Sequence, residues 1–387
     1  MIIISKIKMA KYIPILFIVL AGCGKVVTEG KYKIIGSGEY ISLNTTGLIN
    51  PKTNYLSYYE ENDNCWLFYG NVQRSELIIY KLPSGEIEKR ITFDSRGPEG
   101  IGGYRGVFVH NLDSLFITSA RYVHNFFLAD TSGKVKKRYS LEADDIRGIT
   151  PSLMYQYSHL NNQNIIKNNT INLRLSPVRH VENEDLHEEI ISIEYCLENE
   201  QIVRKFNYPV FDNLKVNNST SSRTYNGEQF IYSFRRSDII YVKNDDGTYI
   251  EYDGKSRYRD KSLDWEIKRH PSIFLVRKNS LSNPRYLSVL YDEYQKFIYR
   301  SFLPGYEIDD TKENAEIEKY FDFPKKFTIM IFDEDFNVVG ETLLPEKTYD
   351  PYMKFVSKDG LYMALHFDHP LYNPDSLKFE RMIVVEN

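Results

Sequence analysis

Cysteine is scarce in this sequence, with three among 387 residues, at positions 23, 65 and 196. So few thiols exclude a small domain built on disulfides, and their spacing lacks the closely set pairs of a zinc site. A bond between Cys65 and Cys196 would require an oxidising compartment, and two isolated cysteines in strands are more often buried and unreactive. The sequence therefore leaves open whether this pair is bonded.

A long apolar run is also missing, because a membrane-spanning helix needs about twenty consecutive apolar residues. The apolar run at residues 12–20 is too short, and it follows Lys6, Lys8 and Lys11. A basic stretch before a short apolar run is the pattern of a secretory signal. We therefore expect residues 1–22 to be a signal peptide and the mature chain to have no membrane span.

Clustered positive charge is absent as well. The chain has 49 basic and 53 acidic residues, and removal of the three lysines in residues 1–22 changes the net charge from −4 to −7. A surface that binds phosphate backbones needs a concentrated basic face. The sequence therefore predicts no nucleic-acid partner.

Directly after the apolar run comes the sequence Leu20-Ala21-Gly22-Cys23. It resembles the lipobox of bacterial lipoproteins, in which small residues fit the signal peptidase and the cysteine thiol accepts lipid. Two or three acyl chains on Cys23 would hold the protein firmly on a membrane. Gly24 stands where an aspartate typically directs inner-membrane retention, so the resemblance implies the cell envelope, at the outer membrane. Residues 23–32 are then a lipidated tether; the alternative is an ordinary signal peptide with a chance cysteine.

The rest of the sequence is typical of an all-β protein, with 31 tyrosines, 22 phenylalanines and short alternating segments separated by Asn, Asp and Gly. A polar turn followed by a compact apolar strand recurs six times, with turn centres near residues 64, 113, 162, 227, 293 and 359. A second hairpin follows most of these turns, most clearly around Gly85, Gly133 and Gly247. Two hairpins per unit predict four strands per unit.

Six units of four strands describe a six-bladed β-propeller, here a single domain over residues 33–387. The last unit lacks one strand, and the segment at residues 33–43 could supply it, so we expect strands from both ends of the chain to close the ring. Polar insertions at residues 176–188 and 304–320 interrupt the pattern, and the second is expected to contain the only helix. A seven-bladed propeller or a β-sandwich is the structural alternative.

A family resemblance follows from the lipobox together with the segments at residues 97–101, 107–117 and 127–133. These resemble the Bacteroidetes-type lipoproteins of unknown function that form six-bladed, TolB-like propellers. The resemblance is strongest over residues 70–140. It implies an envelope location and a propeller, and it supplies no catalytic residues.

The candidate ligand site lies where the second strand joins the third and where each unit joins the next, because these loops meet at one face of a propeller. The crossover at residues 94–106 is rich in glycine, so its backbone amides could approach a ligand, and its arginines could bind a carboxylate or sulfate. The candidate residues on this face are Arg96, Glu99, Tyr104, Arg105, Arg121, His124 and Arg147. The alternative is that the glycines only turn the chain between blades.

Two further groups have weaker patterns. His366, Asp368 and His369 could ligate a divalent metal, but nothing in the sequence completes the site, and we expect no cofactor. Asp144 and Asp145 form an acid pair of the kind that glycosidic hydrolysis needs. The sequence thus favours a binding or scaffolding module of the cell envelope, with an envelope protein or a small-molecule or glycan ligand as partner, over the alternative of an envelope hydrolase or lyase acting on glycans.

Overall fold

The computed structural model describes residues 30–46, 56–141, 152–153, 161–176, 186–211, 220–263, 272–308, 313–321 and 323–387. The predicted signal peptide, Cys23 and nearly all of the tether lie outside the described residues, as do Asp144, Asp145 and Arg147. Among the helices of the described part, none is long and apolar enough to cross a membrane.

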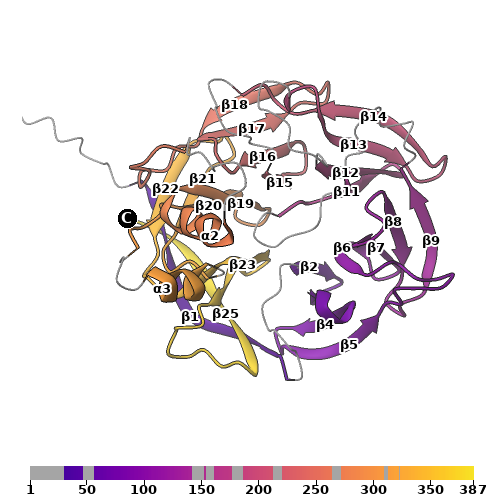
Figure 1. The fold of residues 1–387 in the computed structure, drawn as a ribbon, viewed down its shortest axis with the longest axis horizontal. Helices are drawn as coiled ribbons and strands as arrows, with labels where there is room; N and C mark the ends of the chain where they lie inside the picture. The colour runs from indigo at the N-terminus through magenta and orange to yellow at the C-terminus, as the bar shows by residue number, and fades with distance from the viewer. Residues whose placement is uncertain are drawn as a thin grey trace, which may run out of the picture.

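The described residues form antiparallel sheets arranged around a central axis (Figure 1). The first sheet contains β2 (Leu56–Glu61), β3 (Asn64–Asn71), β4 (Glu76–Leu82) and β5 (Glu86–Thr92), with the short helix η1 (Val72–Arg74) between β3 and β4. The second contains β6 (Tyr104–Asn111), β7 (Ser114–Ser119), β8 (Asn125–Ala129) and β9 (Val135–Ser140). Both follow the four-strand unit that the sequence predicts.

The third sheet contains β10 (Ser152–Leu153), β11 (Ile165–Lys167), β12 (Thr170–Ser176), β13 (Ile190–Cys196) and β14 (Gln201–Asn207). Here the first strand is split, because β10 and β11 both pair with β12. The fourth sheet contains β15 (Ser221–Tyr225), β16 (Phe230–Phe234), β17 (Ile239–Lys243) and β18 (Tyr249–Asp253).

The remaining strands form one eight-stranded sheet. Its first half is β19 (Arg285–Asp292), β20 (Phe297–Leu303), β21 (Thr328–Phe332) and β22 (Val338–Leu343). Its second half is β23 (Tyr349–Ser357), β24 (Gly360–Leu365), β25 (Ser376–Glu386) and the N-terminal β1 (Tyr32–Asn44). The two halves share one backbone pairing, of Tyr32 of β1 with Gly340 of β22, and they also pack against each other in one buried cluster. The structure thus has four separate sheets and this joined one, where the sequence predicts six separate units.

Strands from the two ends of the chain close the ring, as predicted. β1 pairs antiparallel with β25 from Tyr32 opposite Glu386 to Asn44 opposite Ser376, with an irregularity between Gly36 and Tyr40. The prediction of an all-β propeller closed in this way is confirmed.

Tight turns explain most of the register. Gly85, Gly133 and Gly247 have positive φ values of 72°, 86° and 93° in the hairpins β4–β5, β8–β9 and β17–β18, the conformation that these turns need and that glycine adopts without strain. The position predicted for the third of the six turns is wrong. The cluster around Asn162 precedes β11, and the hairpin turn is at Asn168 and Asn169, which have φ values of 50° and 63°.

Two α-helices occur among the described residues, where the sequence predicts one. α3 (Glu313–Tyr320) falls in the predicted insertion. α2 (Ile273–Ser282) begins after Ser272, whose hydroxyl accepts a hydrogen bond from the backbone of Leu275, a standard N-cap. Leu281 of α2 packs with Ile317 and Tyr320 of α3, so the two helices stabilise each other.

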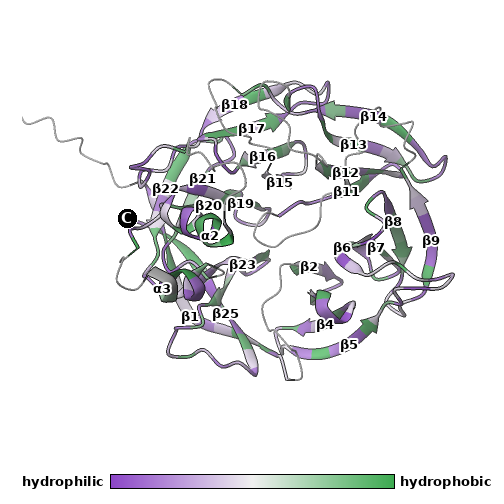
Figure 2. Cartoon of the chain, in the orientation of Figure 1, coloured by the Kyte–Doolittle hydropathy of each residue, from purple (hydrophilic) through white to green (hydrophobic). Residues whose placement is uncertain are grey.

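The hydrophobic core lies between neighbouring sheets. Leu67 of β3 and Phe355 of β23 belong to one buried cluster, and Phe68 of β3 and Ile117 of β7 belong to the next. The outermost strands are polar instead. Figure 2 shows this for β9, which is mainly hydrophilic and lies beside the apolar β8. Charged outer strands protect the sheet edges against pairing with other chains.

Buried arginines join the sheets on one side of the ring. Arg174 of β12 donates to the Ser221 hydroxyl of β15 at 2.6 Å. Arg300 of β20 donates to the hydroxyl of Ser233 at 2.8 Å and to the carbonyl of Gly254 at 2.8 Å, both in the fourth sheet. Both arginines are at most 1% exposed, so their donors replace the water that backbone carbonyls would otherwise bind.

Cys65 and Cys196 are free. The disulfide that the sequence left open is therefore not formed in this structure.

Candidate functional site

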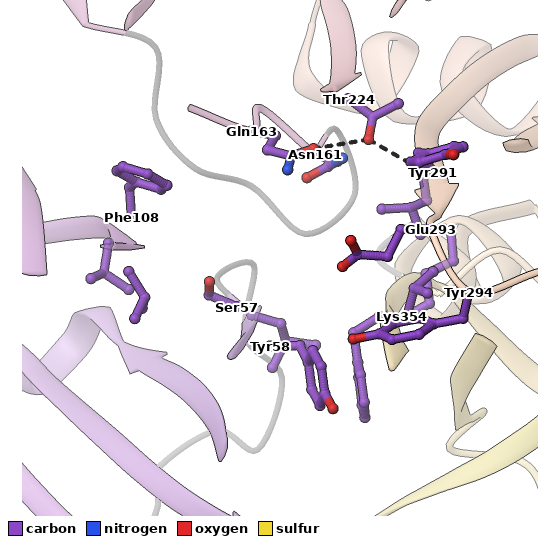
Figure 3. A pocket seen from close by; sticks show the side chains of 16 residues that line it. Ser57, Tyr58, Phe108, Asn161, Gln163, Thr224, Tyr291, Glu293, Tyr294 and Lys354 are labelled. Atoms are coloured by element: carbon purple, nitrogen blue, oxygen red, sulfur yellow. Dashed lines mark hydrogen bonds between the residues drawn. The ribbon is translucent and has the colours of Figure 1, made fainter. Parts of the chain in front are cut away.

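A cavity of about 240 Å³ lies in the channel between the innermost strands (Figure 3). These strands form its walls because β15 packs on β19, β19 on β23, β23 on β2 and β2 on β6. The cavity reaches the turn that follows β19, where Glu293 and Tyr294 line it. Its wall therefore combines side chains from distant parts of the chain.

Hydroxyl groups of β15 hold its neighbours in place. The Ser222 hydroxyl accepts a hydrogen bond from the backbone of Val289 at 3.0 Å and donates to the carbonyl of Asn161 at 2.9 Å. Two residues on, the Thr224 hydroxyl accepts from the backbone of Tyr291 at 3.1 Å. Residues i and i+2 point to the same side of a strand, so this pattern fixes β15 and β19 side by side at the cavity.

The amides at the cavity are also held in place. Asn161 donates through Nδ2 to the carbonyl of Val289 at 2.9 Å. The Oε1 atom of Gln163 accepts from the Thr224 hydroxyl at 3.0 Å and from the backbone of Tyr225 at 2.9 Å. The amide of Gln163 therefore has a defined orientation, with the donors of its Nε2 atom remaining for another partner. Ser57 adds a hydroxyl from the facing β2 (Figure 3).

Aromatic rings make up much of the remaining wall. They belong to Tyr58, Phe108, Tyr291, Tyr294 and Phe355. Figure 3 shows Phe108 across the cavity from Tyr291 and Glu293. Rings beside oriented amides and hydroxyls suit a ligand that has both apolar faces and polar edges.

Glu60 joins two of these tyrosines at the rim. Its Oε2 atom accepts from the hydroxyl of Tyr58 at 2.7 Å and from that of Tyr294 at 3.2 Å, and Lys358 lies 3.4 Å from Oε1. The Tyr58 hydrogen bond, and then Lys358 and Tyr294, hold the pKa of Glu60 below its usual value despite the opposing effect of burial. A charged Glu60 thus fixes both rings across the boundary between β2 and β19.

Lys354 of β23 is a buried cation at the same cavity, 3% exposed. Its Nζ atom donates to the carbonyl of Pro351 at 2.5 Å. Burial lowers the pKa of Lys354 to about 7, and the charge of Asp350 opposes this shift. The amino group is therefore partly neutral at physiological pH, and it would gain or lose a proton near neutrality.

The residues predicted for the face of the glycine-rich crossover lie elsewhere, and none of those that the structure describes lines the channel cavity. Arg96 and Glu99 are exposed in the β5–β6 loop, and Arg121 is exposed after β7. Tyr104 is 1% exposed and stacks on Phe93, with ring centres 6.0 Å apart. His124 and Arg105 are partly buried. Arg147 lies outside the described residues.

The crossover glycines have local structural roles. Gly97, Gly102 and Gly103 have positive φ values. A Cβ atom at Gly102 would lie 2.7 Å from the ring of Tyr122, and the carbonyl of Gly100 accepts from Arg138 at 3.0 Å. These contacts turn and pack the chain between the first two sheets.

The histidine cluster is engaged in its own turn. His366 is fully buried; its Nδ1 accepts from the backbone of Asp368 at 3.0 Å, and its Nε2 lies 3.2 Å from the carbonyl of Phe323. Asp368 pairs with Lys319 at 3.0 Å, and Nδ1 of His369 accepts from the backbone of Leu371 at 3.0 Å. Among the described residues, no group of three or more His, Cys, Asp or Glu is placed to hold a metal ion.

Sequence reasoning missed the channel residues because they are scattered between positions 56 and 356. One signal was available. Tyr58, Phe108, Thr224, Leu290 and Phe355 all stand a few residues before the first hairpin turn of their units. In a propeller this position lies on the innermost strand, so aligning the units on their turns would have placed these side chains around one channel.

Comparison with known proteins gives a family and a fold. Residues 39–343 match the family described as a domain of unknown function, DUF4221. A crystal structure of a DUF4221 family member from Bacteroides vulgatus is similar with a TM-score of 0.78 and 21% identity, covering 93% of this chain and all of that one. A protein from Bacteroides fragilis that is inferred to be exported has a TM-score of 0.51 and 10% identity, over 92% of this chain and 96% of that one. No curated protein is similar in sequence.

Proposed function

We propose that this chain, which belongs to the DUF4221 family, is a binding module of the cell envelope that takes a carbohydrate or related polyol into its channel cavity. The observation that carries the proposal is the composition of that cavity. Five aromatic side chains surround a space of about 240 Å³, beside amides and hydroxyls that are already oriented by hydrogen bonds. Preorganised polar groups reduce the entropy lost on binding.

The size and polarity of the cavity support a sugar over a fatty or strongly charged ligand. A volume near 240 Å³ approaches the lower end of small-molecule sites. Asn161 and Gln163 supply amides, Ser57 supplies a hydroxyl from the facing β2, and Phe108 supplies a ring (Figure 3). Sugars present hydroxyls at their edges and C–H groups at their faces, so both kinds of wall are used.

An envelope location completes the proposal. The signal-like residues 1–22 and Cys23 support export followed by lipid anchoring at the outer membrane. The inferred export of the structurally similar Bacteroides fragilis protein agrees with this location. A membrane would then hold the propeller near envelope glycans.

We further infer six blades of the TolB-like kind. The eight-stranded sheet divides naturally at the single backbone pairing between Tyr32 and Gly340, since each half then has four antiparallel strands. With the other four sheets, this division supports a count of six.

The test is calorimetric titration of the full chain, in detergent, with glucose, galactose, xylose and N-acetylglucosamine. We expect at least one sugar to bind, and Phe108→Ala to weaken that binding at least tenfold because a stacking surface is lost. Phe297→Ala removes another partly buried ring outside the cavity and should leave the affinity unchanged. Silence across all four sugars, or equal binding by the Phe108→Ala protein, would count against the proposal.

A further inference from the structure

Apart from the channel cavity, a group of polar atoms without hydrogen-bond partners lies near the start of β19. It is on the face of the propeller where the second strand of each unit joins the third. Arg285, the first residue of β19, is 2% exposed. The hydrogen bond of its side chain goes from Nη2 to the hydroxyl of Tyr352, at 3.3 Å, and its buried Nε has no hydrogen-bond partner. Buried polar groups without partners are rare in folded proteins and require an explanation.

Arg235 adds a second such group next to the first. It follows β16, and its carbonyl accepts a hydrogen bond from the backbone of Tyr286 at 2.9 Å, which places it beside Arg285. Its Nε is also buried without a partner. Within the described part of the chain, neither Arg235 nor Arg285 forms an ion pair with a carboxylate.

Electrostatics shows that these cations are poorly compensated. Burial, and then the positive charge of Arg285, lowers the pKa of Arg235 to about 9; Tyr352 opposes the shift and Arg236 adds to it. Two like charges in a desolvated place repel each other more strongly than in water. A negative charge between them would remove this cost.

Tyr306 supplies a third group without a partner. Its hydroxyl is buried and unbonded, and its side chain lines a small cavity of about 10 Å³ together with Arg285 and Lys326. That volume holds about one water molecule or one oxygen atom of a larger ligand. At this cavity the unpartnered atoms of Arg285 and Tyr306 are both hydrogen-bond donors.

The acids near this place are partly engaged, and Oε2 of Glu316 is buried without a hydrogen-bond partner. Glu316 lies 3.5 Å from Lys325, and its charge acts on Tyr306. Oδ1 of Asp350 accepts from the backbone of Tyr352 at 2.8 Å, and its charge acts on Lys354. Against these two carboxylates stand Arg235, Arg236, Arg285, Lys325 and Lys326, so positive charge remains in excess.

We propose that Arg235, Arg285 and Tyr306 form a binding site for an oxyanion, such as a carboxylate or an inorganic sulfate or phosphate. One oxygen occupies the small cavity beside Arg285 and Tyr306, and the others face Arg235, which is only partly buried and so can be reached from solvent. Guanidinium groups bind such anions through charge-assisted, often paired hydrogen bonds. This site is independent of the proposed sugar site in the channel.

Two measurements on the full chain test the site. Crystals soaked in selenate should show an anomalous peak beside the guanidinium groups of Arg235 and Arg285. In calorimetric titration with sulfate, Arg235→Gln should lower the affinity at least tenfold. Arg90→Gln is the matched control, since Arg90 already pairs with Glu76 at 3.2 Å, and it should bind sulfate like the unmodified protein.

The substitution of Arg235 is preferred because this residue follows β16 in a loop and is partly exposed, so the fold should survive its loss, whereas Arg285→Gln changes a fully buried position. Absence of the selenate peak at this place, or equal sulfate affinity in the Arg235→Gln protein, would overturn the proposal. A ligand for the channel would be unaffected by either result.

Discussion

At the scale of single residues, the buried arginines are the feature that the sequence concealed. Arginine is among the least buried residue types, so a reading of the sequence assigns it to the surface or to a ligand. Here Arg174, Arg223 and Arg300 are at most 1% exposed and donate to hydroxyl or carbonyl acceptors of a neighbouring sheet or its loops. The arginines predicted for the ligand site, by contrast, include the exposed Arg96 and Arg121.

Arg300→Ala should lower the free energy of unfolding by roughly 3 kcal/mol, because several buried acceptors in the fourth sheet lose their donor at once. Chemical denaturation monitored by circular dichroism measures this loss. Arg96→Ala, at an exposed loop position, should change stability by no more than about 0.5 kcal/mol. Similar effects of the two substitutions would mean that Arg300 is not a structural link between sheets.

Lys354 should make stability depend on pH. Its pKa in the folded chain is about 7, whereas a lysine in the unfolded chain titrates near 10.4. Between these values the unfolded state binds more protons, so stability rises with pH, by at most about 1.4 kcal/mol per unit. Lys354→Met removes this contribution. Its stability advantage over the unmodified protein should therefore be largest at pH 6 and shrink by pH 9; a constant difference would contradict the low pKa.

At the scale of helices and strands, the sequence predicted the hairpins better than the strands between them. Gly85, Gly133 and Gly247 each follow a polar residue and mark a turn, because tight hairpins need positive φ and glycine provides it. The third unit was misread since asparagine also adopts positive φ, and this unit has asparagines both near position 162 and at positions 168 and 169. α2 was missed because its residues mix apolar, basic and polar types without a clear apolar stripe.

The pairing of β1 with β25 can be tested by proline substitution. Phe379 is fully buried, and β25 lies between β1 and β24, opposite Ile41 and Ala364. Phe379→Pro removes a ladder donor and a core ring, and should cost at least about 3 kcal/mol. Glu39→Pro places a proline in the irregular part of β1, at an exposed residue outside the pairing register, and should cost much less. Equal losses of melting temperature would argue against closure through β25.

At the scale of the whole molecule, the all-β ring and its closure followed from repeating turns and from an unassigned strand at each end. The channel residues and the oxyanion site could not be predicted from the sequence. Both depend on which side chains of separate sheets face each other, and repeating turns do not reveal how one sheet packs on the next. Arg235, Arg285 and Tyr306 nevertheless belong to the loop face where the sequence predicts a ligand. The sequence also predicts that arginines on this face bind an anion, but it selects other arginines.

The proposed membrane anchor belongs to the scale of the whole molecule and has a direct test. Cys23→Ala should move the protein from the membrane pellet to the soluble fraction after carbonate washing, because acyl chains on this thiol would be the firm attachment. Fractionation followed by immunoblotting measures the shift. Cys65→Ala is the control, since this thiol is buried in the first sheet and should leave the protein in the pellet; retention of the Cys23→Ala protein would exclude lipidation as the anchor.

The strand β1 also sets the order of events during biosynthesis. It precedes β2 in the chain, yet its partner along nearly its whole length is β25 (Ser376–Glu386). β1 must therefore remain unpaired until the other four-stranded units and β25 itself have been made. Each nascent molecule passes through a stage with an open ring and an exposed strand edge, a state that is prone to aggregation. The ring thus closes only once β25 is available, and a chain truncated before Ser376 would lose the pairing of β1 together with β25.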